Sequence, residues 1–144
     1  MNILVTGAAG FIGYHTTDLL LNSGYRVFGI DSLNNYYSVK LKKQRIHEIK
    51  KKWGKKFKFI KNNFLNENFI LNFLKKEKIS IIIHLAAQAG VRHSLEKPMD
   101  YVKNNIVATT NLMEATRKYK KIRHFLLAST SSVYASSTKM PFNE

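Results

Sequence analysis

The chain has 144 residues, enough for one domain with a hydrophobic core, and its net charge is +15. Apolar and charged residues make up 44% and 23% of it, as in ordinary globular proteins, which excludes wholesale disorder. Because it contains no cysteine, disulfides, thiolate metal sites and cysteine nucleophiles are excluded as well.

Short apolar segments alternate with segments of helical periodicity along the chain. In order, the pattern predicts strand 3–6, helix 11–21, strand 25–30, helix 39–52, strand 57–60, helix 67–76, strand 79–85, helix 98–119 and strand 122–128. The longest apolar stretch, residues 79–87, is too short to cross a membrane, and no basic segment of a signal peptide precedes the first apolar run. We therefore expect a cytoplasmic protein without a membrane span.

Strands that are apolar throughout and separated by helices are typical of βαβ units, in which both faces of a parallel sheet are covered. Right-handed crossovers then give an α/β fold, a Rossmann-type doubly wound parallel sheet between two helical layers (αβα). Five strands are predicted, whereas such sheets usually have a sixth. We expect residues 1–144 to form one NAD(P)-binding domain whose sheet is incomplete at the C-terminus.

The turn after the first strand has the glycine spacing of dinucleotide-binding loops, with Gly7, Gly10 and Gly13 between strand and helix. Gly7 permits the tight turn, Gly10 lets a pyrophosphate approach the backbone, and Gly13 lets helix and sheet pack closely. We expect the amides of Phe11 and Ile12 to face the phosphates at the positive end of the helix. The alternative is a helix that only packs tightly.

The second predicted strand ends at Asp31, eighteen residues beyond Gly13. A carboxylate at this position accepts hydrogen bonds from both ribose hydroxyls of NAD and repels the 2′-phosphate of NADP. Ser32 follows it, where an arginine would favour NADP. Unless Asp31 only forms a turn, NAD is the expected cofactor.

The next helix carries much of the positive charge. Nineteen of the 24 basic residues are lysine, and ten of them fall between Lys40 and Lys61. Nucleic-acid-binding surfaces favour arginine for base contacts and intersperse aromatic residues for stacking. Here arginine appears only five times, and no RNA-binding signature is visible. We interpret the lysines as a solvated helix face and expect no specific nucleic-acid partner.

Small and hydroxyl-bearing residues follow the fourth and fifth predicted strands. Residues 85–87 would let a cofactor lie close to the backbone where the strand order reverses, and Arg92 either binds a sugar phosphate or carboxylate or lies on the surface. The hydroxyls of residues 129–132 are placed for substrate, unless they form an ordinary polar loop. His84 is expected to be packed, and because the histidines lack metal-ligand spacing, no metal is expected.

Four segments carry a resemblance to a known family: VTGAAGFIG (5–13), GIDSLNNYY (29–37), HLAAQAGVR (84–92) and ASTSSVY (128–134). Over its whole length the chain resembles the extended short-chain dehydrogenase/reductases, and among them the nucleotide-sugar epimerases of the UDP-glucuronate 4-epimerase type. The resemblance implies NAD as cofactor and a UDP-hexuronate or UDP-hexose as substrate. The cofactor contacts expected from the motifs and the resemblance are Gly7, Gly10, Phe11, Ile12, Gly13, Asp31, Asn35, Asn63, Phe64, Leu85, Ala86, Ala87, Asn105 and Ser129.

The resemblance also implies epimerisation by transient oxidation at the sugar C4. A tyrosinate takes the proton of the 4-hydroxyl while a hydride leaves C4 for NAD, and the hydride then returns to the other face of the 4-keto sugar. Thr130 matches the residue that hydrogen-bonds the 4-hydroxyl, and Ser131 and Ser132 would contact a hexuronate carboxylate. Asn105 matches an asparagine beside the nicotinamide.

The family's proton acceptor is the tyrosine of a Tyr-x-x-x-Lys motif after the fifth strand, in which the lysine lowers the phenol pKa. Tyr134 does not match, because Thr138 stands at the lysine position, and Tyr36 and Lys40 have the spacing but follow the second strand. We therefore expect the amino-terminal half of an enzyme about twice as long, inactive alone. The substrate-binding domain would lie in the other half, and the full-length enzyme would be able to form a homodimer.

Two positions depart from the family pattern, because Asn63 stands where an adenine-binding aspartate is usual and Ala135 replaces a glycine. Two alternative functions also stay open. A sugar 4,6-dehydratase or decarboxylase of the same family would need an acid and a carboxylate directly after Thr130, where Ser131 and Ser132 stand. The other alternative is a catalytically inactive NAD-binding remnant.

Overall fold

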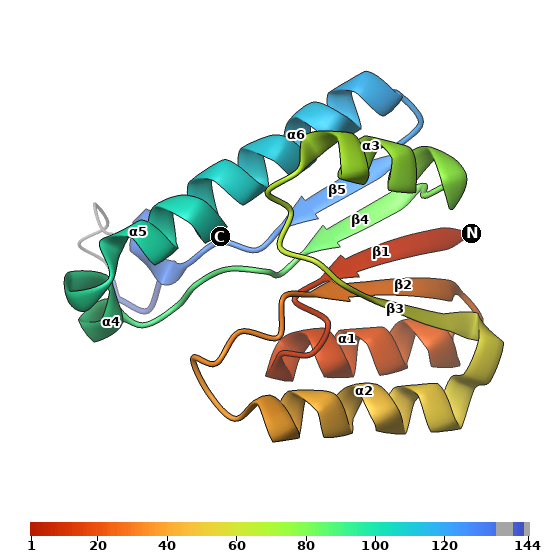
Figure 1. The fold of residues 1–144 in the computed structure, drawn as a ribbon, viewed down its shortest axis with the longest axis horizontal. Helices are drawn as coiled ribbons and strands as arrows, with labels where there is room; N and C mark the ends of the chain where they lie inside the picture. Colours follow the sequence, from red (N-terminus) through yellow and green to blue (C-terminus); the bar gives the residue numbers. More distant parts are fainter. Residues whose placement is uncertain (135–139, 143–144) are drawn as a thin grey trace.

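The core of the structure is a sheet of five parallel strands. A computed structural model of the chain describes residues 1–134 and 140–142. The strands are β1 (Asn2–Thr6), β2 (Arg26–Asp31), β3 (Phe57–Lys61), β4 (Ile81–His84) and β5 (His124–Leu127), and they stand in the order β3-β2-β1-β4-β5 (Figure 1). The chain builds outward from β1 to β3 and then returns to the other side of β1 for β4 and β5. The predicted doubly wound sheet is confirmed.

Helices cover the two faces of this sheet. Figure 1 shows α1 (Phe11–Asn22) and α2 (Val39–Trp53) on one face and α3 (Glu67–Lys76) and α6 (Ala108–Tyr119) on the other. This is the predicted three-layer αβα arrangement. None of the helices in the described part of the chain is long and apolar enough to traverse a lipid bilayer.

Successive side chains of β1 pack against the helices on opposite sides of the sheet, because successive residues of a strand point to opposite faces. Ile3 and Val5 join the apolar cluster on the α1 and α2 side, while Leu4 joins the cluster on the α3 and α6 side. All three are almost completely buried, as expected for the central strand of a sheet covered on both faces. The first cluster also contains Leu21, Val27, Ile46, Ile49 and Phe57, and the second Phe28, Ile70, Leu74, Ile82 and Leu112.

Polar side chains and a glycine set several helix ends. The Ser38 hydroxyl accepts a hydrogen bond from the Leu41 amide (3.3 Å) at the start of α2, and the Asn66 side chain accepts one from the Phe69 amide (2.9 Å) at the start of α3. Gly54, with φ of +53°, ends α2 where the sequence predicts a break.

The predicted helix 98–119 consists of three consecutive helical segments. α5 (Pro98–Tyr101) leads into a π-helical segment (Val102–Val107), which continues as α6. Such segments are rare and are frequently found at functional sites. The helix α4 (Val91–Glu96) is not predicted from the sequence. Its apolar residues Val91 and Leu95 are exposed, so α4 lacks the buried apolar face on which a prediction from periodicity depends.

β4 and β5 are shorter than predicted because they pair over only four residues each. The expectation that both sheet faces are covered fails at β5. Leu126 and Leu127 point to opposite faces of the sheet, yet they are 43% and 53% exposed. The physical reason is position, since β5 is the last strand in the sheet order and, among residues 1–134 and 140–142, is paired only with β4.

Candidate functional site

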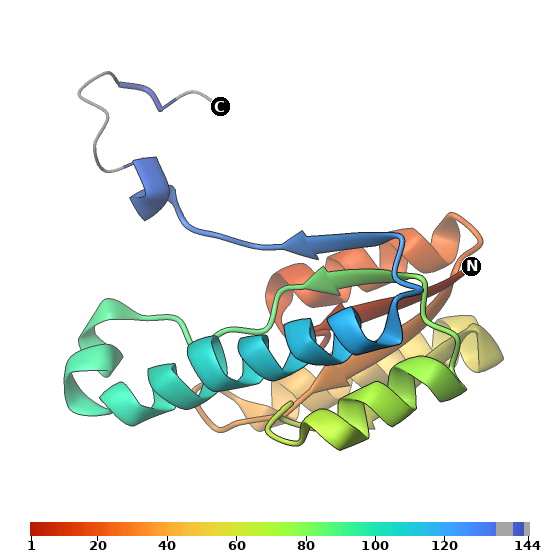
Figure 2. The same ribbon diagram turned by 90° about the horizontal axis from the view of Figure 1, so that it is seen from above.

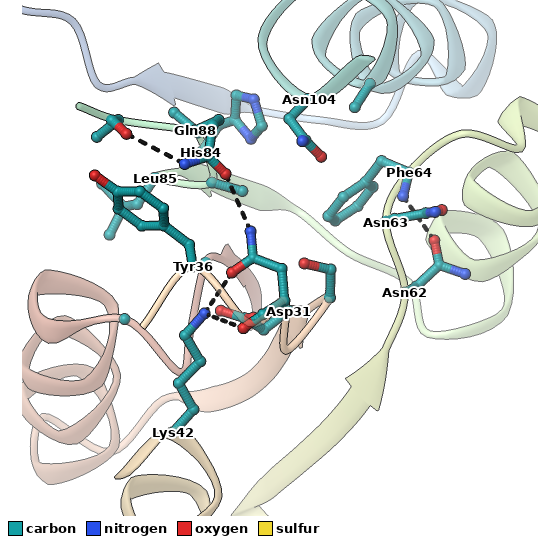
Figure 3. Close-up of a pocket in the computed structure, with 18 of the residues that line it drawn as sticks. Asp31, Tyr36, Lys42, Asn62, Asn63, Phe64, His84, Leu85, Gln88 and Asn104 are labelled. Carbon is teal, nitrogen blue, oxygen red and sulfur yellow. Dashed lines mark hydrogen bonds between the residues drawn. The ribbon is translucent and has the colours of Figure 1, made fainter. Parts of the chain in front are cut away.

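A cavity lies where the strand order reverses, at the carboxyl ends of the strands. It has a volume of about 210 Å³ and is lined by residues of the loops after β1, β2, β3 and β4, together with two residues of the helical segment that ends in α6 (Figure 3). β1 and β4 are hydrogen-bonded neighbours, although the chain forms β2 and β3 between them. This crevice is the usual ligand site of a doubly wound sheet.

The glycine loop after β1 forms one wall of the cavity. Gly7 has φ of +67°, a conformation that glycine adopts freely, and a Cβ atom there would lie 3.0 Å from the Ala86 amide nitrogen. A Cβ atom on Gly13 would overlap the Gly7 carbonyl oxygen, so α1 packs directly against the loop. A Cβ atom on Gly10 would lie 3.1 Å from the same oxygen. The loop therefore turns tightly and brings bare backbone to the cavity and to the beginning of α1.

Asp31 joins the glycine loop to the loop after β2. Its Oδ2 accepts a hydrogen bond from the Ala9 amide (3.1 Å), and its Oδ1 accepts one from the Leu33 amide (2.7 Å). The carboxylate lines the cavity and retains further lone pairs for hydrogen-bond donors of a ligand. The residue predicted to bind a ribose thus stands beside the loop predicted to bind phosphates.

A buried hydroxyl–imidazole pair holds the tips of β1 and β4 together. The Thr6 hydroxyl oxygen accepts hydrogen bonds from the amides of Leu85 (3.1 Å) and Ala86 (3.0 Å), so its own proton is donated to Nδ1 of His84 (2.7 Å). His84 then donates from Nε2 to the Thr109 hydroxyl (3.0 Å). Burial lowers the pKa of His84 to about 4. The imidazole is therefore neutral near pH 7, and His84 is packed, as the sequence analysis expects.

Lys42 is a cavity residue that sequence reasoning missed. It is only 4% exposed, and its Nζ donates hydrogen bonds to the backbone carbonyl (2.8 Å) and the side-chain oxygen (2.6 Å) of Asn34. Burial lowers the pKa of Lys42, and the nearby Asp31 carboxylate opposes this shift. The lysine-rich helix is therefore not a solvated face throughout. The overlooked signal is the helical spacing, which puts Lys42 on the buried side of α2 with Ile46 and Ile49.

Gln88 and Asn105 hold the loop after β4. The Gln88 amide donates to the Asn105 side-chain oxygen (2.7 Å), and the Asn105 side-chain nitrogen donates back to the Gln88 carbonyl (3.0 Å). Asn105 belongs to the π-helical segment, and its neighbour Asn104 lines the cavity. Gln88 is 5% exposed and also lines the cavity, although the sequence analysis assigned it no role.

The structure brings eight of the predicted cofactor residues to the cavity lining: Gly7, Gly10, Asp31, Asn63, Phe64, Leu85, Ala86 and Ala87. Gly13 lies behind the loop, and the side chains of Phe11 and Ile12 are exposed, although both belong to the first turn of α1. Asn35 is exposed, whereas Asn34 and Tyr36 beside it line the cavity. The remaining candidates, Arg92, Asn105, Ser129, Thr130, Ser131 and Ser132, are not among the lining residues.

The predicted catalytic and substrate residues follow β5 in an exposed segment. Figure 2 shows the chain after β5 leading away from the layered body of the domain. The Thr130 hydroxyl oxygen accepts a weak hydrogen bond from the Ser132 amide (3.4 Å), and both side chains are exposed. Arg92 is exposed on α4, which agrees with the surface alternative. Ala135 lies outside the described residues.

The sequence matches a family model described as GDP-mannose 4,6 dehydratase over residues 4–144. Among curated proteins it is 45% identical to a UDP-glucuronate 4-epimerase of Thermodesulfobacterium geofontis over 141 residues, covering 98% of this chain and 42% of that protein. The chain spans about two fifths of the length of the curated relatives it matches.

Among solved structures, the chain is again similar to 4-epimerases. A UDP-glucuronic acid 4-epimerase of Bacillus cereus, in complex with UDP-glucuronic acid and NAD, superposes with a TM-score of 0.84 at 41% identity, covering 96% of this chain and 43% of that one. A UDP-glucose-4-epimerase of Stenotrophomonas maltophila with bound NAD and formylated UDP-arabinopyranose superposes with a TM-score of 0.85 at 26% identity, covering 99% of this chain and 40% of that one.

Proposed function

The chain belongs to the family that the GDP-mannose 4,6 dehydratase model describes, and from this membership we propose that it forms the NAD-binding domain of a nucleotide-sugar 4-epimerase that acts on UDP-glucuronate. The relatives named above support this choice within the family, because the more similar ones are UDP-glucuronate 4-epimerases. The whole enzyme would also need the parts of those relatives that this chain does not span.

The observation that carries the proposal is the meeting of the glycine loop and Asp31 at one cavity. Gly7 and Gly10 offer bare backbone at the start of α1, where a helix favours a diphosphate. Asp31, fixed by the Ala9 and Leu33 amides, is in position to accept hydrogen bonds from ribose hydroxyls. These residues fit a dinucleotide with an unsubstituted ribose, which is NAD.

Lys42 does not argue for NADP, although it is a cation in the same cavity. Its Nζ is engaged by two oxygen atoms of Asn34 and lies 4.2 Å from the centre of the Tyr37 ring. A 2′-phosphate would have to take this ammonium group from Asn34 and also approach the Asp31 carboxylate. The like-charge repulsion at Asp31 disfavours that arrangement.

Bound NAD would supply a reversible hydride acceptor for the sugar C4. Within this chain, Thr130 would hydrogen-bond the sugar 4-hydroxyl, and Ser131 and Ser132 would contact the hexuronate carboxylate. Serine hydroxyls are neither acids nor bases near pH 7, so these positions support epimerisation over elimination of water. The tyrosine that acts as base would come from beyond residue 144.

Titration calorimetry of the chain with NAD and NADP tests the cofactor assignment. We expect NAD to bind and NADP to bind at least tenfold more weakly. Asp31→Asn should weaken NAD binding by about tenfold, since a hydrogen bond to a charged group contributes roughly 1.5–3 kcal/mol. The matched control is Asp18→Asn, because Asp18 contacts Lys52 and Trp53 away from the cavity. Equal affinities for NAD and NADP would contradict the assignment.

The reaction itself requires the longer protein. Incubated with UDP-glucuronate, that protein should release a product inverted only at C4, UDP-galacturonate, with NAD unchanged in total amount. A product that has lost water would instead identify a dehydratase.

A further inference from the structure

Two loops that line the cavity contact one another. The side-chain nitrogen of Asn34, in the loop after β2, donates a hydrogen bond to the side-chain oxygen of Gln88, in the loop after β4 (3.2 Å). Close by, the Tyr36 hydroxyl occupies the space that a Cβ atom on Gly90 would need. Figure 3 labels Tyr36 and Gln88 among the residues that line the cavity. We call these four residues, Asn34, Tyr36, Gln88 and Gly90, the strap.

Each side of the strap is anchored to a helical segment by buried groups. Lys42 of α2 holds Asn34 through two hydrogen bonds, and Asn105 of the π-helical segment holds Gln88 through two more. Burying an ammonium group is unfavourable unless it is well paired, so the position of Lys42 shows that Asn34 is specifically held. An unbroken chain of polar contacts therefore runs from α2 through the two loops to the π-helical segment.

Two aromatic side chains, His93 and Tyr101, lie beside the contact between Tyr36 and Gly90. The His93 ring lies 5.0 Å from the Tyr36 ring and 6.0 Å from the Tyr101 ring. The Tyr101 hydroxyl faces the carbonyl oxygens of Ala89 and Gly90, which share its one proton. Gly90 has φ of +106°, and this position has neither the conformation nor the space for a side chain. The loop after β4 is thus shaped to receive Tyr36.

The cavity that the strap residues line is small compared with the usual ligand pocket. Pockets for drug-sized ligands have volumes of roughly 300–1,000 Å³, whereas this cavity measures about 210 Å³. NAD, with two nucleosides and a diphosphate, is at the large end of such ligands. Asn34, Tyr36 and Gln88 all line the cavity, so moving them apart enlarges it. The Asn34–Gln88 link is a single uncharged hydrogen bond, which is weak enough to open reversibly.

We propose that the strap is the gate for cofactor exchange, opening by separation of Asn34 from Gln88 to admit the dinucleotide and closing over it afterwards. The proposal rests on the proposed function, because it takes NAD as the ligand. In epimerisation the hydride is returned to the sugar, so the cofactor ends each cycle in its original state and need not leave. A gate that slows its release would therefore not limit turnover.

Rates of dinucleotide binding and release test the gate directly. NADH fluorescence in a stopped-flow instrument gives the association rate, and a chase with excess NAD gives the dissociation rate. We expect Gln88→Leu, which removes the amide but keeps the bulk, to raise both rates about tenfold and to leave Kd within about twofold. Asn34→Ala combined with Gln88→Leu should be no faster than the faster single variant, because either substitution alone already breaks the hydrogen bond between the two loops. Ser94→Ala is the control, since its hydroxyl bonds within α4.

The outcomes separate the gate from the proposed function. A faster dissociation with an unchanged association rate would identify an ordinary ligand contact and overturn the gate, as would unchanged rates. If the unsubstituted chain bound neither NAD nor NADH, the cofactor assignment would fail and the gate with it.

A second measurement uses a covalent cross-link and compares the joined protein with the same protein before joining. Because the chain has no cysteine, Asn34→Cys together with Gln88→Cys provides two unique thiols that a short bifunctional maleimide can join. Joined before NADH is added, they should block its uptake; joined afterwards, they should slow its release at least tenfold. Exchange at the same rate in joined and unjoined protein would overturn the gate.

Discussion

The two ends of the candidate site differ in how their residues are held. On the β1–β2 side, the glycine loop and Asp31 are fixed by backbone contacts within the domain, and a Cβ atom on Gly13 has no room. After β5, by contrast, Thr130 and Ser132 are exposed and contact mainly each other. The described residues therefore shape the cofactor side of the site by themselves, whereas the hydroxyl-bearing side is not shaped by contacts within them.

The physical cause of this difference is the place of each strand in the sheet. β1 is central, paired on both edges and covered by helices on both faces, so any change at its tip disturbs several neighbours. Within the part of the chain that the structure describes, β5 is paired with β4 alone, and Leu126 and Leu127 remain exposed. Substitutions at the two ends should therefore have very different effects on stability.

The largest loss of stability is expected from a substitution at Gly13. In Gly13→Ala the new methyl group would overlap the Gly7 carbonyl, and the domain should lose at least about 3 kcal/mol of stability in urea unfolding. Gly24→Ala is the matched control. Gly24 also has a positive φ (+85°) but has open space around it, so the cost should be about 1 kcal/mol. Equal losses in the two variants would show that the contact between α1 and the glycine loop is not tight.

The second prediction concerns how stability depends on pH at the tips of β1 and β4, where His84 is buried. The pKa of His84 is about 4 in the folded domain and near 6.5 when unfolded, so the unfolded state binds the extra proton first as pH falls. Stability contributed by the neutral imidazole is complete above pH 6.5 and is lost as the pH falls toward 4. Between pH 7 and pH 5 we expect a loss of about 2 kcal/mol, measured by urea unfolding at each pH.

The His84→Gln variant is the control for this pH effect. It should be less stable at pH 7, but its stability should change little between pH 7 and pH 5. A slope as steep as that of the unsubstituted chain would assign the effect to another group.

The smallest effect is expected at the exposed end. Thr130→Ala should change the stability of this chain by less than about 0.5 kcal/mol, because the residue is exposed and weakly bonded. Its affinity for NAD should also stay the same. In the longer enzyme the same substitution should lower kcat while the domain stays folded. A loss of more than about 1 kcal/mol in the isolated chain would show that the segment after β5 is held more firmly than its contacts indicate.

Local sequence patterns predict one part of this site well and another part poorly. Gly7, Gly13 and Asp31 could be predicted because their functions depend on backbone conformation and on fixed spacing along the chain. Gln88 could not, because its position depends on a contact between two loops that are far apart in sequence. Lys42 was missed although the helical spacing puts it on the buried side of α2. The two residue types also do not indicate a place in a cavity, since most lysines are solvated and a glutamine has no characteristic spacing.

The same distinction applies to the fold. The order of strands and helices follows from apolar periodicity, and the sequence predicts it correctly. The π-helical segment (Val102–Val107) and the exposure of β5 depend on packing partners that periodicity does not reveal. Strand lengths depend in the same way on the partner strand, which is why β4 and β5 end earlier than predicted.

The position of β5 also bears on the colloidal behaviour of the protein. Its outer edge is not paired by any strand in the described part of the chain, and such edges tend to associate with one another. The net charge of +15 counteracts this, because copies of the chain repel each other before their edges can meet. Added salt shortens the range of that repulsion to about 10 Å at 0.1 M and about 3 Å at 1 M. Dilute buffers should therefore keep the chain dispersed, and concentrated salt should promote its self-association.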